Sequence, residues 1–144
     1  MHPRYIYWAV LCIICGYAFW QGRRDERVVA SVCFIASVAS LLALNQWHGR
    51  YSDVEHRLLI VDLATLSLFV AVALRSGRFW PLWVAGLQLT TSMGHLLKAM
   101  APDLLPVAYG AALRVWSYPI LIILAIGTWR CQQRARDERR ELIA

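Results

Sequence analysis

The sequence contains little charge for its length. Only 17% of the 144 residues are Asp, Glu, Lys or Arg, whereas 59% are hydrophobic. Typical soluble domains contain about 25% and about 45–50% of these two classes. A chain of this size buries only about two-thirds of its surface on folding, so it could not keep this many apolar side chains from water. The composition therefore excludes a soluble globular enzyme and a disordered chain, and it predicts an integral membrane protein.

The sequence also lacks the short motifs of the common enzyme classes. It contains no HExxH, no GxSxG, no P-loop and no glycine-rich dinucleotide fingerprint. Enzymes that use metal ions on phosphorylated substrates need several carboxylates, and Asp62 is the only acidic residue inside an apolar run. We therefore expect no enzymatic activity, no catalytic residue, no metal site and no cofactor.

The sequence has four cysteines, and their placement predicts no redox or metal framework. The four cysteines lie in or just after apolar runs. Cys12 and Cys15 form one C-x-x-C, but there is no second pair, and no histidine follows Cys15, which excludes covalent haem attachment. Buried free cysteines behave as small hydrophobic residues. We therefore interpret this pair as structural.

Five apolar runs are long enough, or nearly so, to cross a membrane as helices. A spanning helix needs about 20 mainly apolar residues, with a range of about 17–25. The first run ends in Phe19 and Trp20, where a cleavable signal peptide would need small residues, so we expect it to be retained. The sequence predicts an all-α polytopic membrane helix bundle over residues 1–129, with a charged cytoplasmic tail over 130–144. The expected spans are about 5–20, 28–47, 58–74, 79–100 and 107–129.

Aromatic residues lie at the ends of these runs, where membrane helices carry an interfacial belt. These aromatic residues support the placement of the spans. They are Tyr5, Tyr7, Trp8, Trp20, Trp47, Phe79, Trp80, Trp83 and Trp129.

The placement of arginine orients the helices. If the break at 21–27 is cytoplasmic, ten arginines lie on the cytoplasmic side and three on the outer side. This is the bias expected of an inner-membrane protein, and it predicts a periplasmic N-terminus and a cytoplasmic C-terminus. A four-helix alternative, in which 79–100 lies flat on the membrane, ranks second. It would place the arginines of the tail on the same side as Arg50 and Arg57.

The formal net charge of +6 is divided among the short breaks between apolar runs. A nucleic-acid-binding protein would gather its charge on one face, so we expect no nucleic-acid partner. The basic tail 130–144 is interpreted as a solvated helix end held at the anionic headgroups of the lipid bilayer. A docking site for a cytoplasmic protein is the alternative.

Four ionisable residues lie inside the predicted spans. Each costs about 2.5–3.5 kcal/mol on insertion scales, and such residues are functional candidates by default. The predicted orientation places all four in the outer half of the bundle, where we expect Asp62 to pair with Arg114 or Lys98. With a neighbouring glutamine they form a candidate site that either fixes helix assembly, binds a ligand or ion, or carries protons. Its members are Asp62, Gln88, His95, Lys98 and Arg114.

The fourth run has two distinct faces. Its polar residues follow offsets of 0, 3, 4, 7 and 10, which places them on one stripe about 120° wide. Small residues recur every four positions on the opposite side, a pattern suited to close helix packing in membranes. We expect the polar stripe to face the bundle interior or a partner subunit. The stripe is Gln88, Thr91, Ser92, His95 and Lys98, and the small residues are Gly86, Thr90 and Gly94.

Haem binding and transport are weaker alternatives. His48 and His95 could approach each other as axial ligands, but His48 is followed by Gly49 and Arg50 and is typical of a loop residue. Two histidine ligands to haem would need to lie deep in facing helices. A transporter needs repeats and discontinuous helices, whereas this sequence has no internal repeat, and Pro119 predicts only a mild break.

The second half of the chain resembles a known group of proteins. The segment from Arg78-Phe-Trp-Pro-Leu-Trp to Gly94-His-Leu-Leu-Lys98, followed by Ala108-Tyr-Gly and Trp116-Ser-Tyr-Pro119, is similar to small, uncharacterised proteobacterial inner-membrane proteins. The resemblance implies a bacterial inner membrane and carries no activity.

Together these patterns predict a protein that acts by association. We expect an accessory or assembly subunit of a membrane complex, or a homo-oligomer. The alternative is a small transporter or ligand-binding membrane protein whose site is the polar group in the outer half of the bundle.

Overall fold

The described residues form five α-helices. The computed structural model describes residues 3–45, 51–101 and 106–144, with side chains over 4–43, 56–101 and 115–144. Within these residues there is no β-strand, so the all-α prediction is confirmed. The described part of each predicted apolar run lies on one helix, and the tail continues the last helix without a break. The helices are α1 (Pro3–Gln21), α2 (Arg24–Asn45), α3 (Tyr51–Ser76), α4 (Trp80–Met100) and α5 (Pro106–Ile143).

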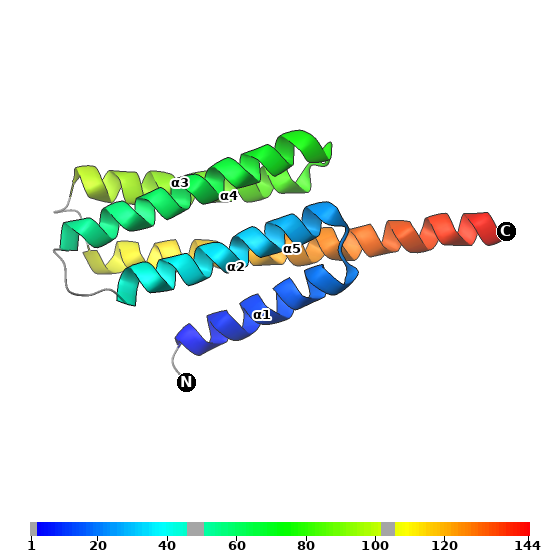
Figure 1. The fold of residues 1–144 in the computed structure, drawn as a ribbon, viewed down its shortest axis with the longest axis horizontal. Helices are drawn as coiled ribbons and strands as arrows, with labels where there is room; N and C mark the ends of the chain where they lie inside the picture. Colours follow the sequence, from blue (N-terminus) through cyan, green and yellow to red (C-terminus); the bar gives the residue numbers. More distant parts are fainter. Residues whose placement is uncertain (1–2, 46–50, 102–105) are drawn as a thin grey trace.

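The helices pack as an antiparallel bundle (Figure 1). Each of the first four packs against the next, and α5 packs against α1, α2 and α4. The α1–α2 and α3–α4 turns lie at one end, the chain begins at the other end, and the last part of α5 projects beyond the bundle. Helix α4 runs alongside α3 along the bundle.

Two glycines make the turns at this end possible. The Gly22 amide donates to the Ala18 carbonyl at 2.8 Å, and a Cβ at Gly22 would overlap that oxygen and lie 2.6 Å from the Cβ of Glu26. Gly77, which follows α3, has a φ of 59°, in the left-handed region that glycine adopts without strain. The chain therefore reverses within a few residues after α1 and after α3.

The core of the bundle is narrow and receives side chains from every helix. Leu11, Val29, Phe69, Val84 and Leu124 are almost completely buried, one from each helix in turn. Large apolar side chains are also exposed on every helix, so the outer surface is apolar on all sides. Examples are Ile13, Ile35, Ile60, Trp83 and Ile122.

Two helices contain a stretch that is long and apolar enough to cross a membrane. These stretches are Arg24–Ala43, with a mean hydropathy of 1.7, and His56–Ser76, with a mean hydropathy of 2.1. The sequence predicted five spans, but in the described residues the other three helices contain no stretch of comparable mean hydropathy. The polar stripe lowers the mean hydropathy of α4, and Arg4 and three tyrosines lower that of α1. The described residues thus form an all-helical bundle with two candidate membrane-spanning helices.

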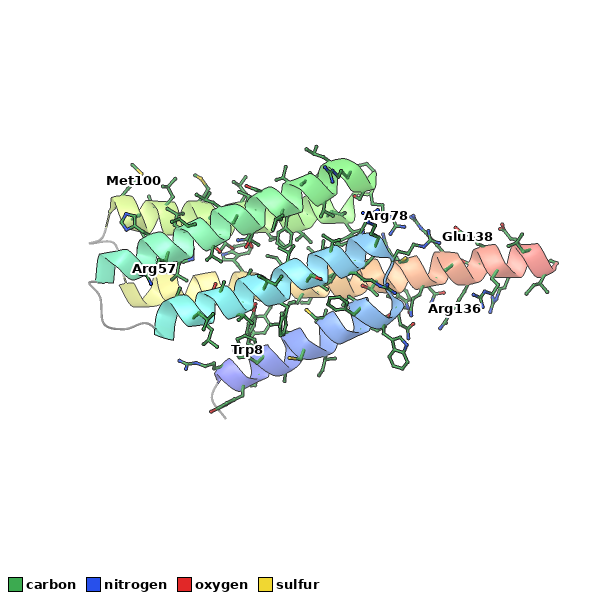
Figure 2. All side chains as sticks on the ribbon, viewed as in Figure 1. Trp8, Arg57, Arg78, Met100, Arg136 and Glu138 are labelled. Atoms are coloured by element: carbon green, nitrogen blue, oxygen red, sulfur yellow. The ribbon has the colours of Figure 1, made fainter. Side chains whose placement is uncertain are left out.

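The arginines gather at one end of the bundle. The two turns and the projecting part of α5 bring them together, and Figure 2 shows Arg78 and Arg136 at this end and Arg57 at the opposite end. We call it the arginine-rich end. Its arginines are Arg23, Arg24, Arg27, Arg75, Arg78, Arg130, Arg134, Arg136, Arg139 and Arg140.

Candidate functional site

Three of the five candidate residues meet between α3 and α4. Asp62 of α3 accepts a hydrogen bond on Oδ1 from Nε2 of Gln88 at 3.1 Å. Its other oxygen, Oδ2, lies 3.1 Å from Nε2 of His95. Gln88 and His95 are seven residues apart on α4, about 10 Å along its axis. One carboxylate therefore joins two side chains that lie two turns apart on the neighbouring helix. We call Asp62, Gln88 and His95 the Asp62 cluster.

The Asp62 cluster is largely shielded from the surroundings. The side chains of His95 and Asp62 are 17% and 16% exposed, and Gln88 is buried. Thr91 and Ser92, which lie between them on the same face of α4, are buried as well. The polar stripe of α4 therefore faces the bundle interior.

The other two candidate residues are placed less closely. Lys98 is half-buried in the last turn of α4, one turn beyond His95. Arg114 belongs to α5, but its side chain lies outside the described residues, as does His48. The sequence offered Arg114 or Lys98 as the partner of Asp62. In the structure Gln88 and His95 surround the carboxylate, two partners that the spacing alone did not assign to it.

Polar atoms in and beside the cluster keep unused hydrogen-bonding capacity. Within the described side chains, Oδ2 of Asp62, Nδ1 of His95 and Oγ of Ser92 are buried and have no hydrogen-bond partner. Oδ2 of Asp62 lies against Nε2 of His95. A carboxylate and an imidazole at this distance can share or exchange a proton. The cluster is thus chemically able to hold a small polar group or a proton.

A second polar cluster lies at the arginine-rich end. Glu26, in the first turn of α2, is 0% exposed, and its Oε1 accepts a hydrogen bond from Nη1 of Arg78 at 2.8 Å. Arg78 follows α3, and its guanidinium also contacts the thiol of Cys131 on α5. We call these three residues the Glu26 cluster. It ties the start of α2, the α3–α4 turn and α5 together.

Arg78 supplies a positive charge beside the buried carboxylate of Glu26. Within the described side chains, the second carboxylate oxygen, Oε2, is buried and has no hydrogen-bond partner. Burial lowers the pKa of the Arg78 guanidinium, but contacts with Cys131 and Glu26 raise it by more, so its pKa lies above the ordinary value. Arg78 is therefore a permanent cation beside a fully buried carboxylate.

Glu26 was not identified as a candidate residue from the sequence. It was assigned to a break over 21–27, which left Asp62 as the only acid inside a run. The break is only Gly22 and Arg23, because α2 begins at Arg24. Asp25 and Glu26 occupy the first turn of α2, where the helix dipole favours carboxylates. Two acids directly before an apolar run are a signal for a helix start.

Further contacts hold α5 at the arginine-rich end. The Tyr17 hydroxyl of α1 donates to Oε1 of Gln132 at 2.7 Å. The indole of Trp80 lies against Gly127, where an added Cβ would come within 3.0 Å of the ring. Helix α5 is therefore anchored to α1 and to the start of α4.

The cysteines and other potential metal ligands are dispersed. All four cysteines are free, with Cys12 exposed and Cys15 buried. The Cys15 thiol donates to the carbonyl of Ala30 at 3.5 Å. In the part of the chain that the structure describes, no three His, Cys, Asp or Glu side chains are grouped closely enough to hold a metal ion.

No family model, curated protein or solved structure matches this chain. Its function therefore has to follow from the two clusters and from the surface of the bundle.

Proposed function

We propose that the protein is a five-span inner-membrane helix bundle that acts by association, either as an accessory or assembly subunit of a membrane complex or as a homo-oligomer. The two candidate membrane stretches, in α2 and α3, are only 28% and 11% buried. Core helices of soluble proteins are mostly buried, whereas membrane helices turn apolar side chains outward to lipid. The exposed apolar surface supports a bilayer environment on all sides of the bundle.

Helix lengths and charge support the multi-pass arrangement. The first four helices have 19, 22, 26 and 21 residues, or about 28–39 Å at the α-helical rise, which matches a hydrocarbon core of about 30 Å. The arginine-rich end faces the cytoplasm by the positive-inside rule, so the N-terminus is periplasmic. The resemblance of the second half of the chain supports a proteobacterial inner membrane.

The orientation of α4 carries the association proposal. Its polar stripe faces inward, so its small residues face outward, with Gly86 and Thr90 exposed and Gly94 half-buried. A Cβ added to Gly86 would meet nothing within 4 Å in the described part of the chain. Small residues let membrane helices approach closely. The outer face of α4 therefore suits a helix of another subunit or another copy.

Replacing Gly86 by leucine is expected to weaken association without harming the fold. The added side chain meets open space within the bundle, but it would hold a neighbouring helix away. We expect the fraction of protein in complexes to fall roughly tenfold or more, as measured by crosslinking in membranes and by size-exclusion chromatography in mild detergent.

Gly16→Leu is the matched control, because Gly16 is exposed on α1 and also has nothing within 4 Å of an added Cβ. It should leave both complexes and thermal stability unchanged. If the wild-type protein is a monomer without partners, or if Gly86→Leu and Gly16→Leu behave alike, association through α4 is wrong.

Reporter fusions test the membrane arrangement. Green fluorescent protein fused after Ala144 is expected to fluoresce, and alkaline phosphatase fused there to be inactive, because the tail is cytoplasmic. Phosphatase fused between α2 and α3 is expected to be active. Phosphatase fused between α3 and α4 is expected to be inactive. A reversed pattern would contradict the orientation, and inactive phosphatase at every position would contradict the spans.

A ligand-binding or transport role is the second candidate. It is favoured by the unpartnered buried atoms of Asp62, Ser92 and His95, since leaving such atoms unbonded costs about 1–3 kcal/mol each. A small polar ligand between α3 and α4 would satisfy them. Loss of a transport or binding signal in Ser92→Ala, with normal yield and normal complexes, would favour this role over association.

A further inference from the structure

A cavity of about 290 Å³ lies at the arginine-rich end, beside the last turn of α1. Gln21 and Arg23 line one side, and residues of the projecting part of α5 line the other, among them Gln132, Arg136 and Arg139. The last three are spaced by four and three positions, so they share one face of the helix. We call this cavity the arginine pocket.

The arginine pocket has an excess of positive charge. Arg23 forms an exposed ion pair with Glu138, with Nη2 and Oε2 3.4 Å apart and side chains 53% and 66% exposed. Exposed pairs of this kind contribute little and exchange readily. No ion pair within the described residues involves Arg136 or Arg139. Guanidinium groups bind phosphate oxygens through paired hydrogen bonds, and the two glutamine side chains add further donors.

The position of the arginine pocket along the bundle matches the lipid headgroups. Trp20 and Trp129 are exposed at this end, as expected for the interfacial aromatic belt. The lining residues begin one position after Trp20 and two positions after Trp129. Side chains on a helix lean toward its N-terminus, so Arg136 and Arg139 lean from the tail back toward the bundle. The pocket therefore opens at the level where phosphates lie in a bilayer.

We propose that the arginine pocket binds the phosphate group of an anionic phospholipid such as phosphatidylglycerol. Basic pockets between membrane helices on the cytoplasmic side commonly take anionic headgroups. This assignment rests on the proposed function, because it requires the arginine-rich end to lie in the cytoplasmic leaflet. It adds a defined stoichiometric site to the general attraction between a basic tail and the membrane surface.

Native mass spectrometry of the protein in neutral detergent tests this site. The wild-type protein, titrated with phosphatidylglycerol, is expected to retain one lipid per chain, and phosphatidylcholine is expected to bind much more weakly. In Arg23→Gln/Arg136→Gln/Arg139→Gln, the affinity for phosphatidylglycerol is expected to fall roughly tenfold to a hundredfold. All three arginines are exposed, so the variant should fold normally by circular dichroism.

The matched control removes the same charge at the same end, outside the arginine pocket. It is Arg24→Gln/Arg75→Gln/Arg140→Gln, whose three arginines are also exposed, and it should keep the wild-type affinity. Equal losses in both triple variants, or equal binding of the two lipids, would overturn the site. Arg139→Gln alone gives a milder test that leaves the Arg23–Glu138 pair in place, and it should weaken lipid binding measurably.

Inorganic phosphate distinguishes the two sources of the bound group. Because the lipid is also held by its acyl chains beside the exposed tryptophans, millimolar phosphate alone should not displace it. Displacement by phosphate would overturn the lipid assignment in favour of free phosphate. Carbonate extraction of the same membranes checks the underlying proposal separately. Release of the protein would overturn the membrane spans, whereas retention without lipid preference would overturn only the arginine pocket.

Discussion

Replacing Arg78 by leucine is expected to lower the free energy of unfolding by about 3–5 kcal/mol, because it leaves a buried carboxylate without its countercharge. Glu26 is 0% exposed, and Nη1 of Arg78 is 2.8 Å from its Oε1. The other oxygen, Oε2, has no partner among the described side chains to compensate. Unfolding in mixed detergent and dodecyl sulfate micelles, followed by circular dichroism, measures the change.

The double variant Glu26→Leu/Arg78→Leu should recover most of this loss, since replacing a buried ion pair by apolar side chains of similar size is often neutral. Arg75→Leu is the control for the loss of an arginine at the same end. Arg75 is exposed, so its replacement should cost less than about 0.5 kcal/mol. If Arg78→Leu is no worse than Arg75→Leu, Arg78 does not compensate the Glu26 charge.

Replacing His95 by leucine is expected to cost about 1–3 kcal/mol, because it leaves a buried oxygen of the Asp62 carboxyl without its partner. The loss is smaller than for Arg78 because Gln88 still donates to the other oxygen of Asp62. The remaining carboxylate is only 16% exposed, so solvent replaces little of the lost interaction. The same unfolding experiment in micelles measures it.

A double-mutant cycle measures the coupling between Asp62 and His95. The free energy of unfolding of Asp62→Leu/His95→Leu should lie within about 1 kcal/mol of that of the wild-type protein, because neither polar side chain is then buried without its partner. Ser67→Leu, at an exposed position on the same helix as Asp62, controls for the added apolar side chain. Single and double variants of equal stability would show that Asp62 and His95 are not coupled.

The number of helices and the contacts of α4 followed from patterns that depend on neighbouring residues. Apolar runs separated by short polar breaks gave five helices, because each run needs only its own backbone hydrogen bonds to form. The offsets of Gln88 and His95 placed them on one face of α4, and this face packs against α3. Asp62, in the middle of an otherwise apolar run, could then be identified as a candidate from its cost in the membrane.

Partners across the bundle could not be predicted in the same way. Tyr7 was assigned to the interfacial belt, but its hydroxyl lies 2.9 Å from Oγ of Ser37 and its ring packs edge-on against Tyr118 at 5.7 Å. Trp80, also assigned to the belt, covers Gly127. These contacts join residues 30 or more positions apart, and they depend on the rotation of each helix about its axis. Spacing along one helix does not determine that rotation.

The burial of Glu26 was missed for a related reason. A carboxylate among arginines is usually solvated, and nothing near Glu26 in the chain indicates that Arg78, 52 positions later, covers it. The tight turn at Gly22 places the start of α2 in the bundle, and Arg78 of the α3–α4 turn contacts it there. Both arrangements depend on tertiary structure, so the local sequence could indicate the helix start but not the ion pair.

Helix α5 is continuous, so its projecting part moves together with the part that lies in the bundle. The helix has 38 residues, a length of about 57 Å, and about 20 Å of this lies beyond Trp129. Because no break separates the two parts (Figure 1), the tail cannot reorient without α5 itself. A tilt of about 10° in the bundle moves the far end of the tail by about 4 Å. A change in how α5 packs against α1 and α4 therefore produces a larger displacement at the far end of α5.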